Sequence, residues 1–208
     1  MASTYLTKTF SGNGSATTHT LSMWVKRGNM DSMQKIFFIG AGSNQHQVYF
    51  AHYPAGGMYN NLQYEFYDGT NNYYIRTNRR FQDTNAWYHI VAVWDTTNAT
   101  SGDRMRLYVN GVRETSFAVE AQPTQNFNGY CNQSTYAYRI GASDSGQNFD
   151  GLISHLHSID GTAYNASTFG STDSTTGEWK INTSPSITMG TNGFTILKDG
   201  NTITDQSS

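Results

Sequence analysis

The stretch from Trp87 to Gly111 decides the fold class of this chain. It begins Trp87-Tyr-His-Ile-Val-Ala-Val-Trp-Asp95, continues through a polar loop, and ends Arg106-Leu-Tyr-Val-Asn-Gly111. Both runs are rich in β-branched and aromatic residues and stop at turn-forming residues, which is typical of β-strands. Asn110-Gly111 is the strongest two-residue hairpin signal, because a type I′ turn requires positive φ at both central positions and Asn and Gly tolerate it.

Similar short runs recur along the chain between clusters of Gly, Asn, Asp and Ser, at about the 8–12-residue spacing of β-sandwiches. We expect strands at 5–10, 20–26, 34–40, 47–51, 62–67, 73–77, 88–95, 105–109, 136–141, 151–158 and 193–197. No segment has a sustained 3.6-residue apolar period, and the one helical turn expected is 166–169, with Asn165 as its N-cap. The pattern predicts an all-β, two-sheet antiparallel jelly-roll sandwich with less than about 10% helix.

The chain fits one domain of this class, because β-sandwiches often reach its length of 208 residues undivided. We expect a single domain over 1–198 and a polar tail or the start of a linker over 199–208. The strand at 193–197 is expected to pair near the N-terminal strand, since the termini of sandwiches commonly meet in one sheet.

The composition excludes several classes of partner. The net charge is −2 and only 13% of residues are charged, so a concentrated basic stripe for nucleic acid is missing. The richest basic run, Arg76-Thr-Asn-Arg79-Arg80, is interpreted as a solvated strand edge. No apolar run approaches the roughly 20 residues of a membrane span. Residues 1–20 also lack the apolar core of a secretion signal, and the single Cys131 allows no internal disulfide.

Further motifs follow the opening stretch in order, namely Arg139-Ile-Gly-Ala142 and Phe149-Asp-Gly-Leu-Ile153. This order resembles the laminin G-like branch of the concanavalin A-like lectin/glucanase superfamily, whose domains mostly bind glycans or proteins and sometimes calcium. The opening segments, Tyr5-Leu-Thr-Lys-Thr-Phe10 and Leu21-Ser-Met-Trp-Val-Lys-Arg27, fit the same family. The tail segments, such as Ile159-Asp-Gly-Thr-Ala-Tyr164, are similar to domains in virion proteins of tailed phages, especially marine ones.

The resemblance implies a non-enzymatic phage virion protein, a fibre, spike or capsid decoration, whose lectin-like domain attaches to surface glycans. The expected partners are a surface glycan and other virion proteins, the expected assembly is a homo-oligomer, and the expected location is the virion. Nucleic acid and membrane insertion are not expected. The alternative is a purely structural virion protein whose loops contact neighbouring subunits and bind no sugar.

The glucanase branch of the superfamily makes an enzyme a third hypothesis. Retaining hydrolysis needs two carboxylates about 5–5.5 Å apart. Glu65 and Asp68 are three positions apart in a strand-like run, so they face opposite sides of a sheet. Glu114 and Glu120 lie in a stretch that resembles a strand end and a loop. We therefore expect no catalytic residues.

Histidines and aspartates raise the question of a metal. His155 and His157 have the i, i+2 spacing that directs two imidazoles to one face, but a tight site needs three or four ligands. Polar residues on a solvent face explain them better, and His89 is expected to be a hydrogen-bonded structural residue. No cofactor is expected, with calcium as the open alternative because hard cations take oxygen ligands. The loops offer Asp95, Asp103, Asp144 and Asp150, of which Asp95, Asp144 and Asp150 are the expected ligands. Structural turn aspartates are the competing interpretation.

Aromatic and amide residues gather in three clusters, around 53–64, 67–74 and 127–133. Flat aromatic rings cover the apolar face of a sugar, while amides and carboxylates bond its hydroxyls. The expected glycan-binding residues are Tyr59, Asn60, Asp68, Asn71, Asn72, Tyr73, Tyr74 and Tyr130. The competing interpretation is that alternate tyrosines, such as Tyr64 and Tyr74, pack between the sheets or form cross-strand pairs.

Overall fold

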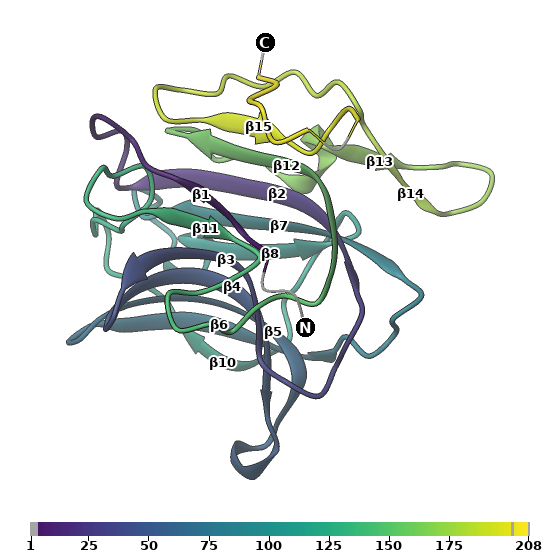
Figure 1. The fold of residues 1–208 in the computed structure, drawn as a ribbon, viewed down its shortest axis with the longest axis horizontal. Helices are drawn as coiled ribbons and strands as arrows, with labels where there is room; N and C mark the ends of the chain where they lie inside the picture. Colours follow the sequence, from purple (N-terminus) through teal and green to yellow (C-terminus); the bar gives the residue numbers. More distant parts are fainter. Residues whose placement is uncertain (1–3, 201, 208) are drawn as a thin grey trace.

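Two antiparallel β-sheets face each other in the computed structural model, which describes residues 4–200 and 202–207 (Figure 1). Strands account for 47% of the chain and helix for 4%. The prediction of an all-β, two-sheet jelly-roll sandwich is therefore confirmed. Within the described residues, no helix is long and apolar enough to cross a membrane.

The first sheet has seven strands, in the spatial order β1 (Leu6–Lys8), β11 (Tyr138–Ile140), β3 (Gln34–Ala41), β4 (Asn44–Tyr53), β5 (Met58–Asp68), β6 (Asn72–Arg80) and β10 (Phe117–Ala121). The second has six, in the order β15 (Phe194–Ile196), β12 (Gly151–Asp160), β2 (Thr18–Arg27), β7 (Trp87–Asp95), β8 (Met105–Val109) and β9 (Val112–Arg113). A small separate hairpin joins β13 (Gly170–Thr172) to β14 (Trp179–Ile181), and three 3₁₀ turns are η1 (Pro54–Gly56), η2 (Ser101–Asp103) and η3 (Ala166–Thr168).

The predicted hairpin at the end of β8 is confirmed. Asn110 has φ 49° and Gly111 has φ 81°, the positive values that a type I′ turn needs. All eleven expected strands are present, most of them with shifted ends. The strands that the sequence did not reveal are short or lie at edges, namely β9, β10, β13 and β14. The expected helical turn is present as η3, but Asn165 makes no side-chain capping bond.

The expected pairing of the two terminal strands is wrong. β1 pairs with β11 in the seven-stranded sheet, whereas β15 pairs with β12 in the six-stranded sheet. The two ends meet through side chains instead, because Lys8 lies 5.1 Å from the ring centroid of Phe194. The last described segment also returns to β15, where the Gln206 N–H donates to the Thr195 carbonyl at 2.7 Å. The boundary between a domain and a tail at 198 stays a prediction.

The core lies between the sheets and is largely aromatic. Trp94, Phe66 and Tyr138 are among its fully buried members, and burying a large apolar side chain contributes about 1.5–3 kcal/mol. A second cluster lies on the outer face of the six-stranded sheet, where η3 and the following Phe169 pack on Val91 and Val93. The chain after β12 thus covers that outer face. The outward side chains of the seven-stranded sheet belong to neither apolar cluster.

Candidate functional site

The outer face of the seven-stranded sheet carries a patch of polar and aromatic side chains. In β4 and β5 the inward residues, such as Val48 and Tyr64, belong to the core, so their neighbours in sequence point outward. Strand register sets these outward residues in two rows across the sheet. We call them the Glu65 cluster: Lys35, Tyr49, Gln63 and Arg76 in one row, and Gln47, Glu65 and Tyr74 in the other.

Glu65 is the centre of this cluster. Its Oε2 accepts hydrogen bonds from Tyr49 Oη at 2.7 Å, Gln47 Nε2 at 2.9 Å and Gln63 Nε2 at 3.2 Å. Hydrogen bonds to a carboxylate are stronger than neutral ones, so these bonds hold three side chains in place. In the part of the chain that the structure describes, the amide oxygens of Gln47 and Gln63 are buried without a partner. The cluster therefore retains hydrogen-bonding capacity that the fold does not use.

A cation and a phenol lie together beside Glu65. The Lys35 ammonium is 3.3 Å from the centroid of the Tyr49 ring, close enough for a cation–π interaction. Burial lowers the pKa of Lys35 to about 8, and the charges of Glu65 and Asp144 partly oppose this. Burial, reinforced by Glu65, raises the pKa of Tyr49 well above its ordinary value. At neutral pH, Tyr49 thus remains a proton donor.

This arrangement suits hydrogen bonding to hydroxyl groups. Amide and carboxylate oxygens accept from hydroxyls, and the half-buried ring of Tyr74, the cross-strand neighbour of Glu65, adds an aromatic surface. The sequence signal for the cluster was the alternation in Gln45-His-Gln47-Val-Tyr49 and Gln63-Tyr-Glu65. That alternation is also typical of any solvated strand face, so sequence reasoning missed the cluster.

The structure brings five of the expected glycan-binding residues to one end of the sandwich. Asp68, Asn71, Asn72 and Tyr73 lie in or beside the β5–β6 turn. Tyr130 reaches the same end, where its Oη donates to Asn44 Oδ1 at 3.0 Å and Asn44 pairs with Asp68.

Several of these side chains are occupied within the fold. Asp68 accepts the N–H groups of Thr70 and Asn71 and the Asn71 amide, and the bond from that amide is the main cause of the lowered pKa of Asp68. The Tyr73 ring packs 5.0 Å from that of Phe127. Burial raises the pKa of Tyr130 to about 12. Asn72 is the exposed member of the group.

Tyr59 and Asn60 lie at the other end of β5, about 30 Å away at roughly 3.3 Å per residue. Asn60 is only 3% exposed, and its Oδ1 accepts from the guanidinium of the buried Arg27 at 2.7 Å. The expectation that Asn60 contacts a ligand on the surface is wrong, because its side chain satisfies an internal charge. Tyr59 is 37% exposed and lies under the Arg80 guanidinium, 4.8 Å from it.

The three aspartates expected as calcium ligands do not share a site. Asp95 pairs with Thr18, the first residue of β2. The Asp150 carbonyl accepts the backbone N–H of Gly28, which follows the last residue of β2. Ten strand residues, about 30 Å, separate these positions. Asp144 instead accepts the N–H of Gly42. Among residues 4–200 and 202–207, no group of three or more His, Cys, Asp or Glu side chains is placed to hold a metal ion.

His89 and His157 are structural. His89 accepts from Trp179 Nε1 at 3.0 Å through Nδ1 and bonds Ser22 Oγ at 2.9 Å through Nε2, as expected of a hydrogen-bonded residue. His157 is buried, so its expected place on a solvent face is wrong. A bulge in β12 shifts the register between Ser154 and His157 and separates His157 from His155.

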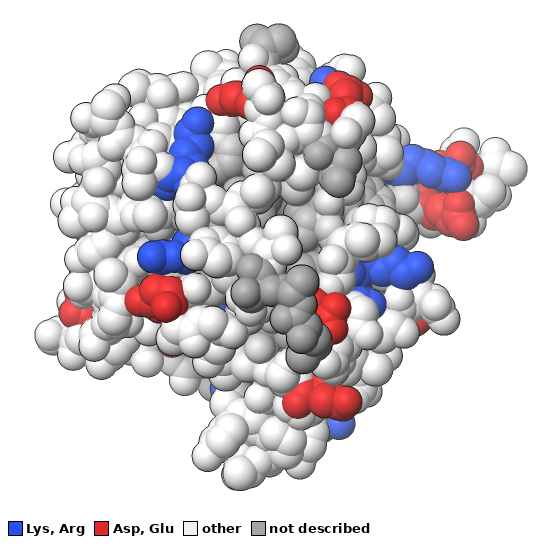
Figure 2. Space-filling model, viewed as in Figure 1, with Lys and Arg blue, Asp and Glu red and all other residues white. Residues whose placement is uncertain are grey.

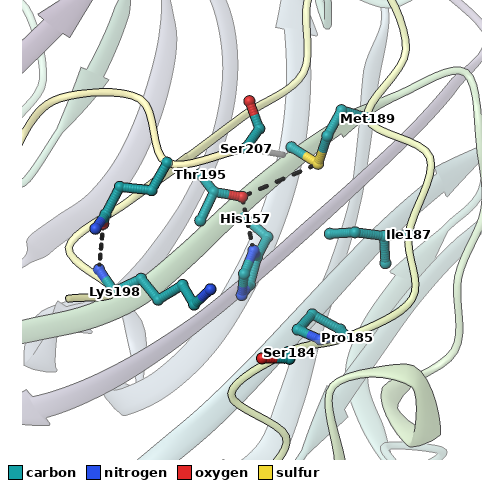
Figure 3. A pocket seen from close by; sticks show the side chains of 9 residues that line it. His157, Ser184, Pro185, Ile187, Met189, Thr195, Lys198 and Ser207 are labelled. Carbon is teal, nitrogen blue, oxygen red and sulfur yellow. Dashed lines mark hydrogen bonds between the residues drawn. The ribbon is translucent and has the colours of Figure 1, made fainter.

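Figure 3 shows His157 in a pocket between β12, β15 and two loop segments. His157 Nδ1 bonds Thr195 Oγ1 at 2.9 Å. Gln206 Oε1 accepts the backbone N–H of Lys198 at 2.9 Å, and the Lys198 ammonium lies 3.8 Å from Asp199. The two bonds of Gln206, to Lys198 and to the Thr195 carbonyl, attach the C-terminal segment to the sheet.

A sandwich of two antiparallel sheets, with largely polar outward side chains on the seven-stranded sheet, defines a jelly-roll β-sandwich protein. The model of the concanavalin A-like lectin/glucanases superfamily matches residues 2–167. The chain belongs to this superfamily.

Solved structures share the fold at low sequence identity. Domain 4 of AbnA, a GH43 extracellular arabinanase from Geobacillus stearothermophilus solved with arabinotriose, is 18% identical with a TM-score of 0.55, over 72% of this chain and 64% of that one. The heptameric SAP-like pentraxin from Limulus polyphemus is 17% identical with a TM-score of 0.52, over 86% and 85%. Tailspike protein 2 of an Escherichia coli O157:H7 bacteriophage is 9% identical with a TM-score of 0.52, over 78% and 22%. The chain thus spans less than two thirds of the arabinanase and tailspike structures, and the comparison with curated proteins found no match.

Proposed function

We propose that this protein is a non-enzymatic carbohydrate-binding module that attaches a phage virion to surface glycans through the Glu65 cluster. The observation that carries the proposal is the set of polar groups around Glu65, with the buried amide oxygens of Gln47 and Gln63 lacking partners among the described residues. A buried acceptor without a partner costs about 1–3 kcal/mol. Gln47 and Gln63 are 1% and 4% exposed, so their side chains would turn outward when a sugar binds, and sugar hydroxyls are donors that would then remove this cost.

Two further features support a neutral glycan as ligand. Charged side chains are sparse on the face of the molecule seen in Figure 2, and 13% of all residues are charged. The fold is also shared with an arabinanase domain that was solved with arabinotriose. Hydrolysis by a carboxylate pair needs a second acid, whereas the Glu65 cluster contains one carboxylate beside amides, phenols and the cations Lys35 and Arg76.

A glycan array followed by calorimetry on the best ligand tests the site. Tyr74→Ala and Glu65→Gln should each weaken binding by about 1–3 kcal/mol, the usual cost of removing an anchor or unbalancing a buried polar group. Tyr53→Ala is the matched control, because Tyr53 is 56% exposed at the far end of β4. Full-strength binding by folded Tyr74→Ala and Glu65→Gln proteins would exclude the cluster.

The virion setting belongs to the same proposal, together with virion partners and a homo-oligomer. The tail motifs of the sequence and the shared fold with a phage tailspike support it. Imaging of an intact particle with a labelled antibody against this domain tests it. If the protein binds no glycan on the array and oligomerises as its concentration rises, the alternative of a purely structural virion protein would be favoured. Release of reducing ends from a bound glycan would overturn the non-enzymatic assignment.

A further inference from the structure

A second aromatic surface lies on the six-stranded sheet, on the opposite side of the sandwich from the Glu65 cluster. Trp24 in β2, Trp87 in β7 and Ile181 in β14 line a shallow pocket there, together with Ser154 and His155 of β12. This end of the sheet lies beyond the apolar cluster that covers Val91 and Val93. We call these five residues the tryptophan shelf.

The ring of Trp24 is held in place by its neighbours. Trp24 stacks on His89 with centroids 5.1 Å apart and planes 25° apart. His89 is fixed in turn by hydrogen bonds from both ring nitrogens, to Ser22 and Trp179. Trp87 pairs with Lys26, which places it diagonal to Trp24 on the same face, and it is 38% exposed. One indole held in place and a second, exposed one therefore form a platform, and the fixed ring of Trp24 loses little entropy when a flat ligand binds.

The bulge in β12 brings two polar side chains to this platform. Successive residues of a regular strand point to opposite faces, yet Ser154 and His155 both line the shelf. His155 has φ 46°, a left-handed conformation that non-glycine residues adopt at a cost. Its Nδ1 lies 2.7 Å from Ser154 Oγ. Bulges re-aim side chains in this way beside binding sites.

The chemistry of the shelf selects the class of ligand. Apart from the half-buried His155, whose pKa burial lowers, the lining residues are uncharged types, so an ionic ligand finds no counter-charge. Trp24 Nε1 is buried with no acceptor in the described part of the chain. A protein interface uses about 20–30 residues on each side, many more than the five that line this pocket.

We propose that the tryptophan shelf is a second carbohydrate site, which stacks one neutral sugar ring on Trp87 and Trp24 and bonds its hydroxyls through Ser154 and His155. The proposal does not rest on the Glu65 cluster, since the two sites lie on different sheets. With both sites filled, one domain would bridge two glycan chains.

Intrinsic tryptophan fluorescence tests the shelf directly, with maltohexaose, cellohexaose and xylohexaose as probes. At least one probe should change the emission of the wild-type protein saturably. Trp87→Ala should weaken that response at least tenfold, and His155→Gly, which keeps the backbone conformation while removing the imidazole, should weaken it as well. Tyr53→Ala is the control for loss of an exposed aromatic ring, and circular dichroism checks that each variant is folded.

Tyr74→Ala separates this proposal from the first. A fluorescence response that survives Tyr74→Ala and is lost in Trp87→Ala supports the shelf, whether or not the Glu65 cluster binds. The shelf is overturned if none of the three probes changes the emission, or if folded Trp87→Ala responds like the wild type. It is also overturned if Trp87→Ala changes only self-association.

Discussion

At the scale of the residue, Gly111 shows how one position can serve both local and distant structure. Its φ of 81° completes the turn between β8 and β9. A Cβ at this position would also lie 2.3 Å from the Trp179 ring. Trp179 in turn donates to His89, so the turn, the β13–β14 hairpin and the six-stranded sheet meet at this residue.

Gly111→Ala should therefore destabilise the protein more than the turn conformation alone explains. Gly146→Ala is the matched control, because Gly146 has nearly the same φ, 80°, but a Cβ added there would have no neighbour within 4 Å. In the control, the left-handed conformation should lower the free energy of unfolding by about 1–2 kcal/mol. In Gly111→Ala, displacement of Trp179 should lower it by about 1–3 kcal/mol more. Urea denaturation of both variants measures the difference. Equal losses would mean that the Trp179 contact adds nothing.

At the scale of the element, strand alternation gives adjacent tyrosines different roles. Tyr73 in β6 faces inward and packs on Phe66 and Phe127. Tyr74 faces outward beside Glu65. One residue of register thus separates a packing side chain from one that can touch a ligand.

Tyr73→Ala should lower the free energy of unfolding by about 2–4 kcal/mol, because it removes a ring packed against the core. Tyr74→Ala should change stability by less than about 1 kcal/mol and act on glycan binding instead. Thermal melts and calorimetry on the same two proteins test this pair. The reverse result, with Tyr74→Ala the unstable variant, would contradict the assignment of the two faces.

At the scale of the whole molecule, the fold buries four histidines, His19 and His46 between the sheets and His89 and His157 beneath the segment that follows β12, each of which is at most 4% exposed. Burial lowers the pKa of His19 and His89 to about 3 and that of His157 to about 4, and holds that of His46 well below its ordinary value. Each imidazole is thus neutral in the folded protein at a pH where the unfolded chain binds a proton.

Stability should therefore be complete above pH 6.5 and fall as the pH decreases toward the folded pKa values. Each histidine contributes up to about 1.4 kcal/mol per pH unit to this loss. Calorimetry at pH 5 in buffers of different ionisation enthalpy should detect uptake of close to one proton per buried histidine on unfolding. A melting temperature that stays constant from pH 7 to pH 4 would contradict this expectation.

The sequence by itself determined the sandwich, its principal strands and the hairpin at Asn110-Gly111, because these depend on local alternation and on the φ values that Asn and Gly tolerate. It also indicated that tyrosines and amides are concentrated between residues 59 and 74. Only the tertiary structure decided which of them are available to a ligand. The side chain of Asn60 accepts a hydrogen bond from Arg27, which lies 33 positions away in sequence. Glu65 accepts two of its three hydrogen bonds from residues of another strand, Gln47 and Tyr49 of β4.

The tertiary structure also decided which face of each sheet is covered. The segment after β12 packs on Val91 and Val93 of the six-stranded sheet, contributes Ile181 to the tryptophan shelf and leaves Trp87 exposed. The Glu65 cluster, on the other sheet, belongs to neither apolar cluster. Period-two alternation tells which residues share a face but not what lies against that face. The cover depends on contacts between distant segments. It comes mainly from η3 with Phe169 and from Trp179 of β14, and three-residue elements are too short for a periodic signal in the sequence.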